Sequence, residues 1–306
     1  MIDWEKKGLI FSPQETKLPW MLHHAYSPVV IQIDGSIWRC YFAGRNIENR
    51  ATIGFFDVDL NRETEIVDYS KKPVLDLGAT GTFDCDGLIP SSAIKVNEDI
   101  YLYYSGWVRG WKEPLFRTAI GMGVSHDGGT TFEKYSIAPI FDWSLEDPIS
   151  VICPCVFKKE NEYIMIYSST EKWEKIDGEY NSWYFTKCAI SNDAIHWKRV
   201  EKLAIPKKDG ENHVGRISII PTEDGYEGWY GYTREDNGQY RIGYGTSVNG
   251  KEWVRKDDIV GISLSETGFD SEAQAYPYVV KWNDKRYMFY NGNRFGYDGI
   301  GLAVER

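Results

Sequence analysis

Tyr101-Leu102-Tyr103-Tyr104-Ser105-Gly106 is one copy of a short aromatic segment, ending in a small or aromatic residue, that occurs five times along the chain. Aromatic residues favour β-strands, and glycine favours the turns that end them, so each copy predicts a strand. The final residues of successive copies lie 62, 63, 63 and 60 positions apart. The five copies are Trp38–Gly44, Tyr101–Gly106, Tyr163–Ser169, Glu227–Tyr232 and Arg286–Gly292.

Each copy belongs to a larger repeated unit, because one strand precedes it and two follow it. Five units of about 61 residues (306/5) account for the whole chain, so residues 1–306 are predicted to form one domain. Four antiparallel strands repeated five times are typical of an all-β fold, the five-bladed β-propeller. A pair of β-sandwiches would give no reason for a fixed period of four strands.

The two ends of the chain complement each other. Ile300–Val304 has the sequence of a third strand, and the chain stops at Arg306. Trp4–Phe11 resembles the predicted outer strands that begin at Trp197 and Trp253. We therefore expect the N-terminal strand to complete the last blade, which would remove an exposed sheet edge.

Charge and composition exclude several classes of partner. The chain carries 35 Lys and Arg against 45 Asp and Glu, a net charge of −10. An acidic chain is a poor binder of nucleic acid and of anionic membranes, and no apolar run reaches the roughly 20 residues of a membrane span. The first residues lack the features of a signal peptide, so we expect a cytoplasmic location.

Cysteine usage favours neither disulfides nor metal. Five cysteines, an odd number, exclude a complete disulfide framework. Cys153-Pro154-Cys155 has no second Cys or His pair nearby, so we predict no metal site and no cofactor.

Carboxylates recur where the chain enters the first strand of a unit. In a propeller these segments, and the loops between second and third strands, lie on one face around the channel mouth, where loops commonly carry function. Clustered carboxylates shift one another's pKa, and carboxylate pairs cleave glycosidic bonds, while aromatic rims suit sugar rings. The catalytic candidates are Asp86, Asp147, Glu211 and Glu272.

Structural explanations compete with this hypothesis. Asp84, Asp147 and Asp270 precede or begin strands, where aspartate often caps turns, so either role is open for them. Arg45, Arg50 and Arg216 could neutralise the carboxylates or bind an anionic group of the substrate. The candidates for substrate binding are His24, Arg45, Arg50, Asp84, Ser92, Trp107, His213, Arg216, Asp270, Asn291 and Asn293.

The repeat resembles the five-bladed glycosidase superfamily: the arabinanases, invertases and levansucrases of glycoside hydrolase families 43, 32 and 68, and the mannoside phosphorylases of family 130. Three stretches, Phe83–Ser92, Asp270–Glu272 and Tyr290–Asn293, more closely resemble uncharacterised glycosidase-like proteins of bacterial surface-polysaccharide gene clusters. The resemblance covers all five units and implies a saccharide or sugar phosphate as partner. It leaves the oligomeric state open.

The resemblance also implies roles for residues. In the hydrolases an Asp of blade one is the base or nucleophile; here Ser27 stands at that place. Asp147 matches the Asp that tunes the acid, and Glu211 matches the acid itself. Water would then be activated by Asp86, Glu272 or His24, or phosphate held by Arg45, Arg50 and His24 would replace water as the nucleophile.

Three functions follow as hypotheses. The first is a carbohydrate-active enzyme that acts on a glycosidic bond or an activated sugar at the channel mouth, in surface-polysaccharide metabolism. The second is a non-hydrolytic phosphorylase, transferase or isomerase that uses a bound anion. The third is a sugar-binding propeller without catalysis, because fold alone does not establish activity.

Overall fold

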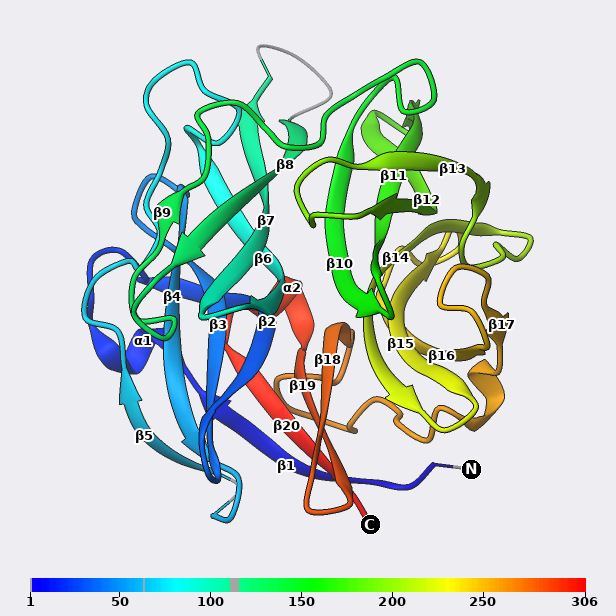
Figure 1. Ribbon diagram of the computed structural model, residues 1–306. Helices are drawn as coiled ribbons and strands as arrows, with labels where there is room; N and C mark the ends of the chain where they lie inside the picture. Colours follow the sequence, from blue (N-terminus) through cyan, green and yellow to red (C-terminus); the bar gives the residue numbers. More distant parts are fainter. Residues whose placement is uncertain (1, 63, 111–115) are drawn as a thin grey trace.

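Antiparallel strands organise the chain into five repeated units, as the computed structural model shows for residues 2–62, 64–110 and 116–306 (Figure 1). The all-β expectation is confirmed. In chain order, unit 1 contains β2 (His23–Asp34), β3 (Ile37–Arg45), β4 (Ala51–Asp59) and β5 (Glu65–Tyr69); unit 2 contains β6 (Gly87–Val96), β7 (Asp99–Arg109), β8 (Phe116–Ser125) and β9 (Glu133–Lys134).

The second half of the chain repeats the pattern. Unit 3 contains β10 (Val151–Lys159), β11 (Glu162–Ile176), β12 (Glu179–Ser191) and β13 (Lys198–Leu203). Unit 4 contains β14 (Glu211–Thr222), β15 (Gly225–Arg234), β16 (Arg241–Ser247) and β17 (Val254–Arg255). The strands of unit 5 are β18 (Ala275–Trp282), β19 (Lys285–Asn291), β20 (Ile300–Glu305) and β1 (Trp4–Phe11), and the short helices are α1 (Pro13–Thr16), η1 (Asp257–Ile259) and α2 (Asn293–Gly296).

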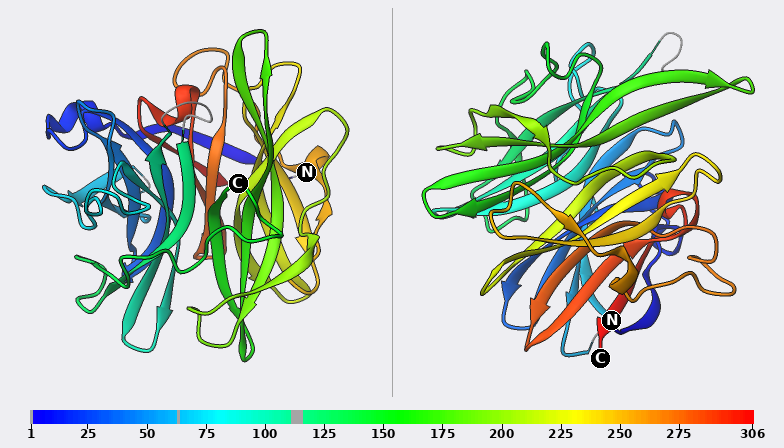
Figure 2. Two further views of the ribbon diagram at one scale, coloured as in Figure 1. Left: turned by 90° about the horizontal axis from the view of Figure 1, so that it is seen from above. Right: turned by 90° about the vertical axis from the view of Figure 1, so that its right-hand side faces the viewer.

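The N-terminal strand completes unit 5, as the sequence predicts. β1 pairs antiparallel with β20, so that Trp4 lies opposite Glu305 and Phe11 lies opposite Ile300. The two ends of the chain therefore lie close together at one edge of the molecule (Figures 1 and 2). No helix among the described residues is long and apolar enough to cross a membrane.

The first strands of the units surround a common axis. β2 contacts β6, β6 contacts β10, β10 contacts β14, β14 contacts β18, and β18 contacts β2 again. The hydrogen-bonded ladders form three separate sheets, because units 1 and 2, and units 3 and 4, are each joined by one parallel bridge. Side-chain packing therefore holds the units together more than backbone pairing does.

Apolar residues fill the spaces between neighbouring units. One cluster contains Phe42 of unit 1 and Phe289 of unit 5, and another contains Trp229 of unit 4 and Met288 of unit 5, all fully buried. Three further clusters join units 1 and 2, 2 and 3, and 3 and 4. The aromatic second strands supply much of this packing, which explains why they recur.

Every first strand is interrupted by a bulge near the axis. The pairing with the second strand shifts between Tyr26 and Val29 in unit 1, and at the corresponding place in the other four units. Bulges redirect side chains, and left-handed backbone at non-glycine residues often marks functional sites. Four bulge residues have positive φ: Ser27 (59°), Cys153 (57°), Arg216 (54°) and Tyr276 (52°).

The substitution Trp4→Ala tests the closure of unit 5. Trp4 is buried, donates its indole N–H to the carbonyl oxygen of Val260 at 2.9 Å, and packs edge-on against Trp229 at 6.1 Å between ring centroids. Its truncation should lower the free energy of unfolding by about 3–5 kcal/mol, measured by urea denaturation. Leu9→Ala, at a half-exposed position of the same strand, should cost under about 1 kcal/mol; equal losses would contradict the role of Trp4.

Candidate functional site

The aspartates that precede the first strands are bound inside their own units. Each accepts a hydrogen bond from a tyrosine 20 residues later on the second strand, and each pairs with one or two cations from the third or outer strand. The sets are Asp84 with Tyr104 (2.9 Å) and Lys134 (2.6 Å), Asp147 with Tyr167 (2.8 Å), Lys187 (2.9 Å) and Arg199 (2.6 Å), and Asp270 with Tyr290 (3.0 Å) and Lys6 (2.6 Å).

We call these buried sets Asp–Tyr–cation clusters, and in two of them the surroundings favour the ionised carboxylate. Burial alone would raise the pKa of Asp147, but hydrogen bonds from Ser169, Arg199, Lys187 and Tyr167 outweigh it and lower that pKa. The pKa of Asp270 is lowered in the same way, by Lys6 and its neighbours against the effect of burial. The clusters tie outer strands to second strands, so the structural explanation accounts for these aspartates.

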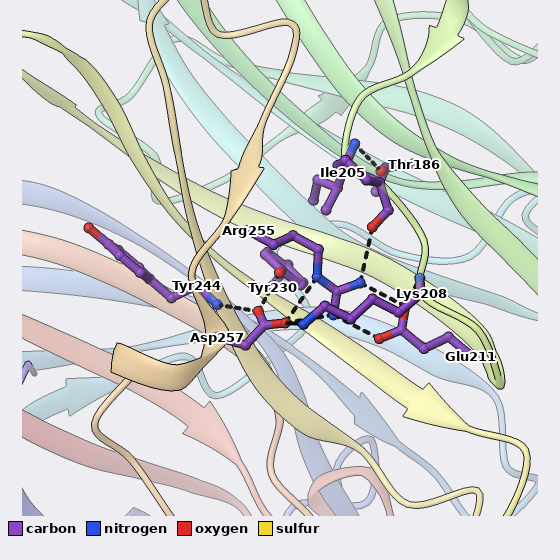
Figure 3. Close-up of polar contacts among 9 residues, drawn as sticks. Thr186, Ile205, Lys208, Glu211, Tyr230, Tyr244, Arg255 and Asp257 are labelled. Carbon is purple, nitrogen blue, oxygen red and sulfur yellow. Dashed lines mark hydrogen bonds and ion pairs between the residues drawn. The ribbon is translucent and has the colours of Figure 1, made fainter.

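Glu211 is also bound to a cation, Arg255 (Figure 3). Its two carboxylate oxygens accept hydrogen bonds from the two terminal nitrogens of Arg255, both at 2.7 Å, and one also accepts the backbone N–H of Lys208 at 2.8 Å. Arg255 also pairs with Asp257 at 2.8 Å, and Asp257 accepts the Tyr230 hydroxyl. Unit 4 thus has its own Asp–Tyr–cation cluster, to which Glu211 is attached.

Asp86 and Glu272 are the more open candidates. Asp86 is half-buried; one oxygen accepts the backbone N–H of Arg109 at 2.8 Å, and the other lies 3.9 Å from Nε of Arg50. The exposed Glu272 lines a cavity of about 760 Å³ beside unit 5. All four catalytic candidates lie at or just before the start of a first strand, but only these two face solvent to a useful extent.

An arc of aromatic rings extends around the axis, at the end where the first strands begin. Neighbouring ring centroids lie 4.1–6.3 Å apart, and the rings come from units 1, 5, 4 and 3. Most members are half-buried, so the arc borders an accessible space. The aromatic arc consists, in order, of His24, Tyr26, Tyr276, Tyr240, His213 and Tyr184.

The two imidazoles of the arc are neutral near pH 7. Burial, with Arg45 nearby, lowers the pKa of His24 to about 3, and burial lowers the pKa of His213 to about 4. The ring nitrogens of His213 are hydrogen-bonded to the hydroxyls of Ser182 at 3.0 Å and Thr233 at 2.8 Å. His213 is therefore held in place through both ring nitrogens, and neither imidazole contributes a charge to the site.

Several buried N–H groups around the arc have no hydrogen-bond partner among the described residues. They are Nε of Arg45, whose guanidinium lies 5.2 Å from the Tyr26 ring centre, Nε1 of Trp107 and Nε of Arg216. An unsatisfied buried donor costs about 1–3 kcal/mol. Indole N–H groups without a partner in the described part of the chain also occur in the apolar clusters, on Trp38 and Trp229. The three donors beside the arc, however, lie next to half-buried aromatic rings and would suit a ligand with hydrogen-bond acceptors.

Arg216 lies buried on the axis beneath the arc. It donates to the carbonyl oxygens of Pro28, at 2.6 Å, and Ser91. Within the described residues no carboxylate pairs with it, and burial lowers its pKa. A buried cation without a counter-ion is costly and gives the site a positive potential.

The remaining sequence candidates bind backbone groups. Ser92 accepts the N–H of Val156 at 3.0 Å, and Asn291 links units 5 and 1 by accepting the N–H of Ser27 and donating to the carbonyl of Ala25, both at 2.8 Å. Asn293 accepts the N–H of Glu272 at 2.8 Å.

The structure thus brings together His24, Arg45, Trp107, His213 and Arg216 of the predicted set, whereas the clustered aspartates and Glu211 are bound to cations of their own units. Sequence reasoning missed Tyr26, Tyr184, Tyr240 and Tyr276. A usable signal was present for Tyr26 and Tyr276, since both lie within two residues before a proline of a first strand. Among the described residues, no three His, Cys, Asp or Glu side chains gather to hold a metal ion.

Comparison with known proteins gives relatives and a fold. The chain is 32% identical over 302 residues to two Mycobacterium tuberculosis proteins, Uncharacterized protein MT1551 and Uncharacterized protein Rv1502, covering 98% of this chain and 98% of each relative. No family model matches it.

The similar solved structures are glycoside hydrolase-like propellers. One is a glycoside hydrolase with a TM-score of 0.77 at 16% identity, covering 100% of this chain and 92% of that one. Another is a thermostable family-43 glycoside hydrolase with a TM-score of 0.66 at 19% identity, covering 92% of this chain and 88% of that one. A member of the GH130 family of mannoside phosphorylases, which contains hydrolases of β-1,2 mannosidic linkages, has a TM-score of 0.70 at 14% identity, covering 99% and 93%. These identities establish the fold only.

The substitution Asp147→Ala tests the clusters. It leaves Lys187, Arg199 and the Tyr167 hydroxyl without their shared acceptor, so the free energy of unfolding should fall by about 3 kcal/mol at pH 7. Because the folded-state pKa of Asp147 is lowered, its contribution is present above the unfolded pKa near 4 and lost as pH falls through the folded value. The difference between wild type and variant, measured by denaturation, should therefore shrink below about pH 4.

The matched control is Glu174→Ala, which removes an exposed pair with Lys172 and should cost at most about 1 kcal/mol at any pH. A loss at Asp147 no larger than this would show that the clusters do not stabilise the fold.

Proposed function

The chain belongs to the family of the Mycobacterium tuberculosis proteins MT1551 and Rv1502, and from this premise we propose that it is a carbohydrate-active enzyme acting on a glycosidic bond or an activated sugar. The propeller fold of glycoside hydrolases and mannoside phosphorylases supports the proposal at the level of chemistry class. We interpret the five units as five blades whose first strands line the channel.

The proposal rests on the aromatic arc and on the N–H groups beside it that have no hydrogen-bond partner among the described residues. The C–H faces of a sugar ring pack on aromatic rings, while its hydroxyls need a few placed polar groups. The arc provides rings from four units, and Arg45, Trp107 and Arg216 each provide a buried donor. His24, which is neutral, is suited to a sugar hydroxyl, and the His213 ring, held by Ser182 and Thr233, adds an aromatic face.

Acid–base chemistry is assigned to Asp86 or to Glu272, the two candidate carboxylates that face solvent. Such a group exchanges a proton with substrate or water, and its partner is a second carboxylate or, in a phosphorolytic reaction, phosphate. Asp147 and Glu211 are held by cations, so we assign them positioning roles: Asp147 fixes unit 3, and Glu211 fixes Arg255.

A phosphorolytic or group-transfer reaction is the second candidate, and it is favoured because no carboxylate of the described chain pairs with Arg216. The positive potential on the axis suits phosphate or a sugar phosphate, bound by Arg45, Arg50 and His24 near the arc. Tight saccharide binding without turnover would identify the third candidate, a sugar-binding protein. Surface-polysaccharide metabolism in the cytoplasm is the proposed setting, carried by the sequence resemblance and composition.

The substitution Asp86→Asn tests the acid–base assignment. Its kcat on the best substrate from a panel of aryl glycosides, oligosaccharides and sugar phosphates should fall about 10²–10⁴-fold, the usual contribution of a general acid or base. Asp68→Asn, an exposed aspartate on the outer strand β5, is the control and should retain wild-type turnover. Unchanged turnover of Asp86→Asn would remove Asp86 from the chemistry.

The substitution Arg45→Gln tests the anion site. If phosphate is the nucleophile, turnover should require inorganic phosphate, and this variant should raise the KM for phosphate about 10–100-fold through loss of a charge-assisted hydrogen bond. Arg62→Gln, an exposed arginine paired with Glu65 on the outer strand, should leave that KM unchanged. Turnover independent of phosphate would favour hydrolysis over this second candidate.

A further inference from the structure

A left-handed turn separates the aromatic arc from the cavity beside unit 5. Three consecutive residues, Arg294, Phe295 and Gly296, have φ of 53°, 57° and 79°. Side chains of L-residues disfavour this conformation, and two adjacent non-glycine residues in it are maintained only where the surroundings impose it.

Side-chain amides on both sides fix the turn. Asn293 accepts the backbone N–H groups of Glu272 and Ala273 at 2.8 and 3.0 Å, and its own N–H bonds to the carbonyl of Phe269. A Cβ atom on Gly296 would collide with Nδ2 of Asn291, so only glycine fits there. The turn is therefore built into the fold, and α2 lies against β2 in unit 1 (Figure 1).

The turn presents Phe295 to solvent between the two spaces. Phe295 is 52% exposed, although large apolar side chains are normally buried, and its ring meets Tyr240 of the arc edge-on at 5.8 Å. The guanidinium of Arg294 lies 4.1 Å from the ring centre of Tyr297, which stacks on His23 at 5.4 Å. One face of the turn thus continues the aromatic surface outward from the arc.

The cavity beyond the turn has the size and chemistry of a sugar site. Its volume of about 760 Å³ falls within the range of small-molecule pockets, roughly 300–1,000 Å³. Its lining combines hydrogen-bond donors and acceptors with one aromatic ring. The lining residues include Gln14, Phe269, Glu272, Asn293, Arg294 and Asp298. Mixed polar groups of both charges around a ring suit a neutral, hydroxyl-rich ligand rather than an ion.

We propose that the rim between the arc and this cavity is a second saccharide subsite, in which the exposed ring of Phe295 is the platform for a sugar ring and the cavity beyond it accepts the next part of the chain. The substrate is then an oligosaccharide, or the end of a polysaccharide, that extends from the arc across the turn toward unit 5. The inference rests on the proposed function, because it takes the arc as the first saccharide site. On this inference, the turn selects a substrate by the number of its sugar units rather than by the identity of one sugar.

Binding to saccharides of graded length tests the subsite. Methyl glycosides and linear chains of two to five mannose, arabinose, fructose or glucose units are titrated by calorimetry against the purified full chain. For the sugar that binds, wild type should gain affinity from one unit to two or more. Phe295→Ala should reduce that gain in affinity about 10-fold, the amount expected for one aromatic contact, and Phe295→Tyr should restore the gain.

The control is Tyr135→Ala, another half-exposed aromatic on a distant loop, which should retain the full gain with length. A gain that survives in Phe295→Ala while Tyr276→Ala abolishes binding would overturn the subsite and leave the arc in place. Failure of every saccharide to bind would overturn the proposed function and the subsite together.

Discussion

A single buried guanidinium crosses the axis of the molecule, and the first strands are arranged around it. Arg216 of β14 donates to carbonyl oxygens of β2 and β6, so one side chain links units 4, 1 and 2. Both acceptors lie at bulges, where a carbonyl is released from the strand ladder. The bulges therefore have two roles. They supply the hydrogen-bond acceptors for Arg216, and in units 1 and 5 they place Tyr26 and Tyr276 beside the axis.

Residues that recur from unit to unit can be distinguished in this chain from residues that break the repeat, and the two groups have different roles. Tyrosine stands two positions before the end of the aromatic segment in units 2 to 5, as Tyr104, Tyr167, Tyr230 and Tyr290, and each donates to an aspartate of an Asp–Tyr–cation cluster. Unit 1 has Phe42 at that position. A carboxylate that recurs with the fold belongs to the fold, so the residues that break the repeat are better guides to the site.

The sequence predicts the parts of the structure that depend on local pattern. Strand periodicity predicts the second strands, and the similarity of Trp4–Phe11 to outer strands predicts its pairing with β20. The ion pair between Glu211 and Arg255 was not predicted, because it joins residues 44 positions apart through the packing of two strands. The aromatic arc was missed for the same reason: its rings are adjacent only once four units have assembled.

Stability and binding are thus supplied by different layers of the molecule. The apolar clusters between units and the Asp–Tyr–cation clusters lie away from the axis and stabilise the scaffold. Near the axis the chain accepts left-handed backbone at Ser27, Cys153, Arg216 and Tyr276, and leaves donors without a partner in the described part of the chain, all of which cost free energy. Such costs persist only in a region that the surrounding scaffold over-determines, and a ligand that satisfies the donors would recover part of them. A ligand bound as proposed at the mouth of the axis would therefore stabilise the folded protein.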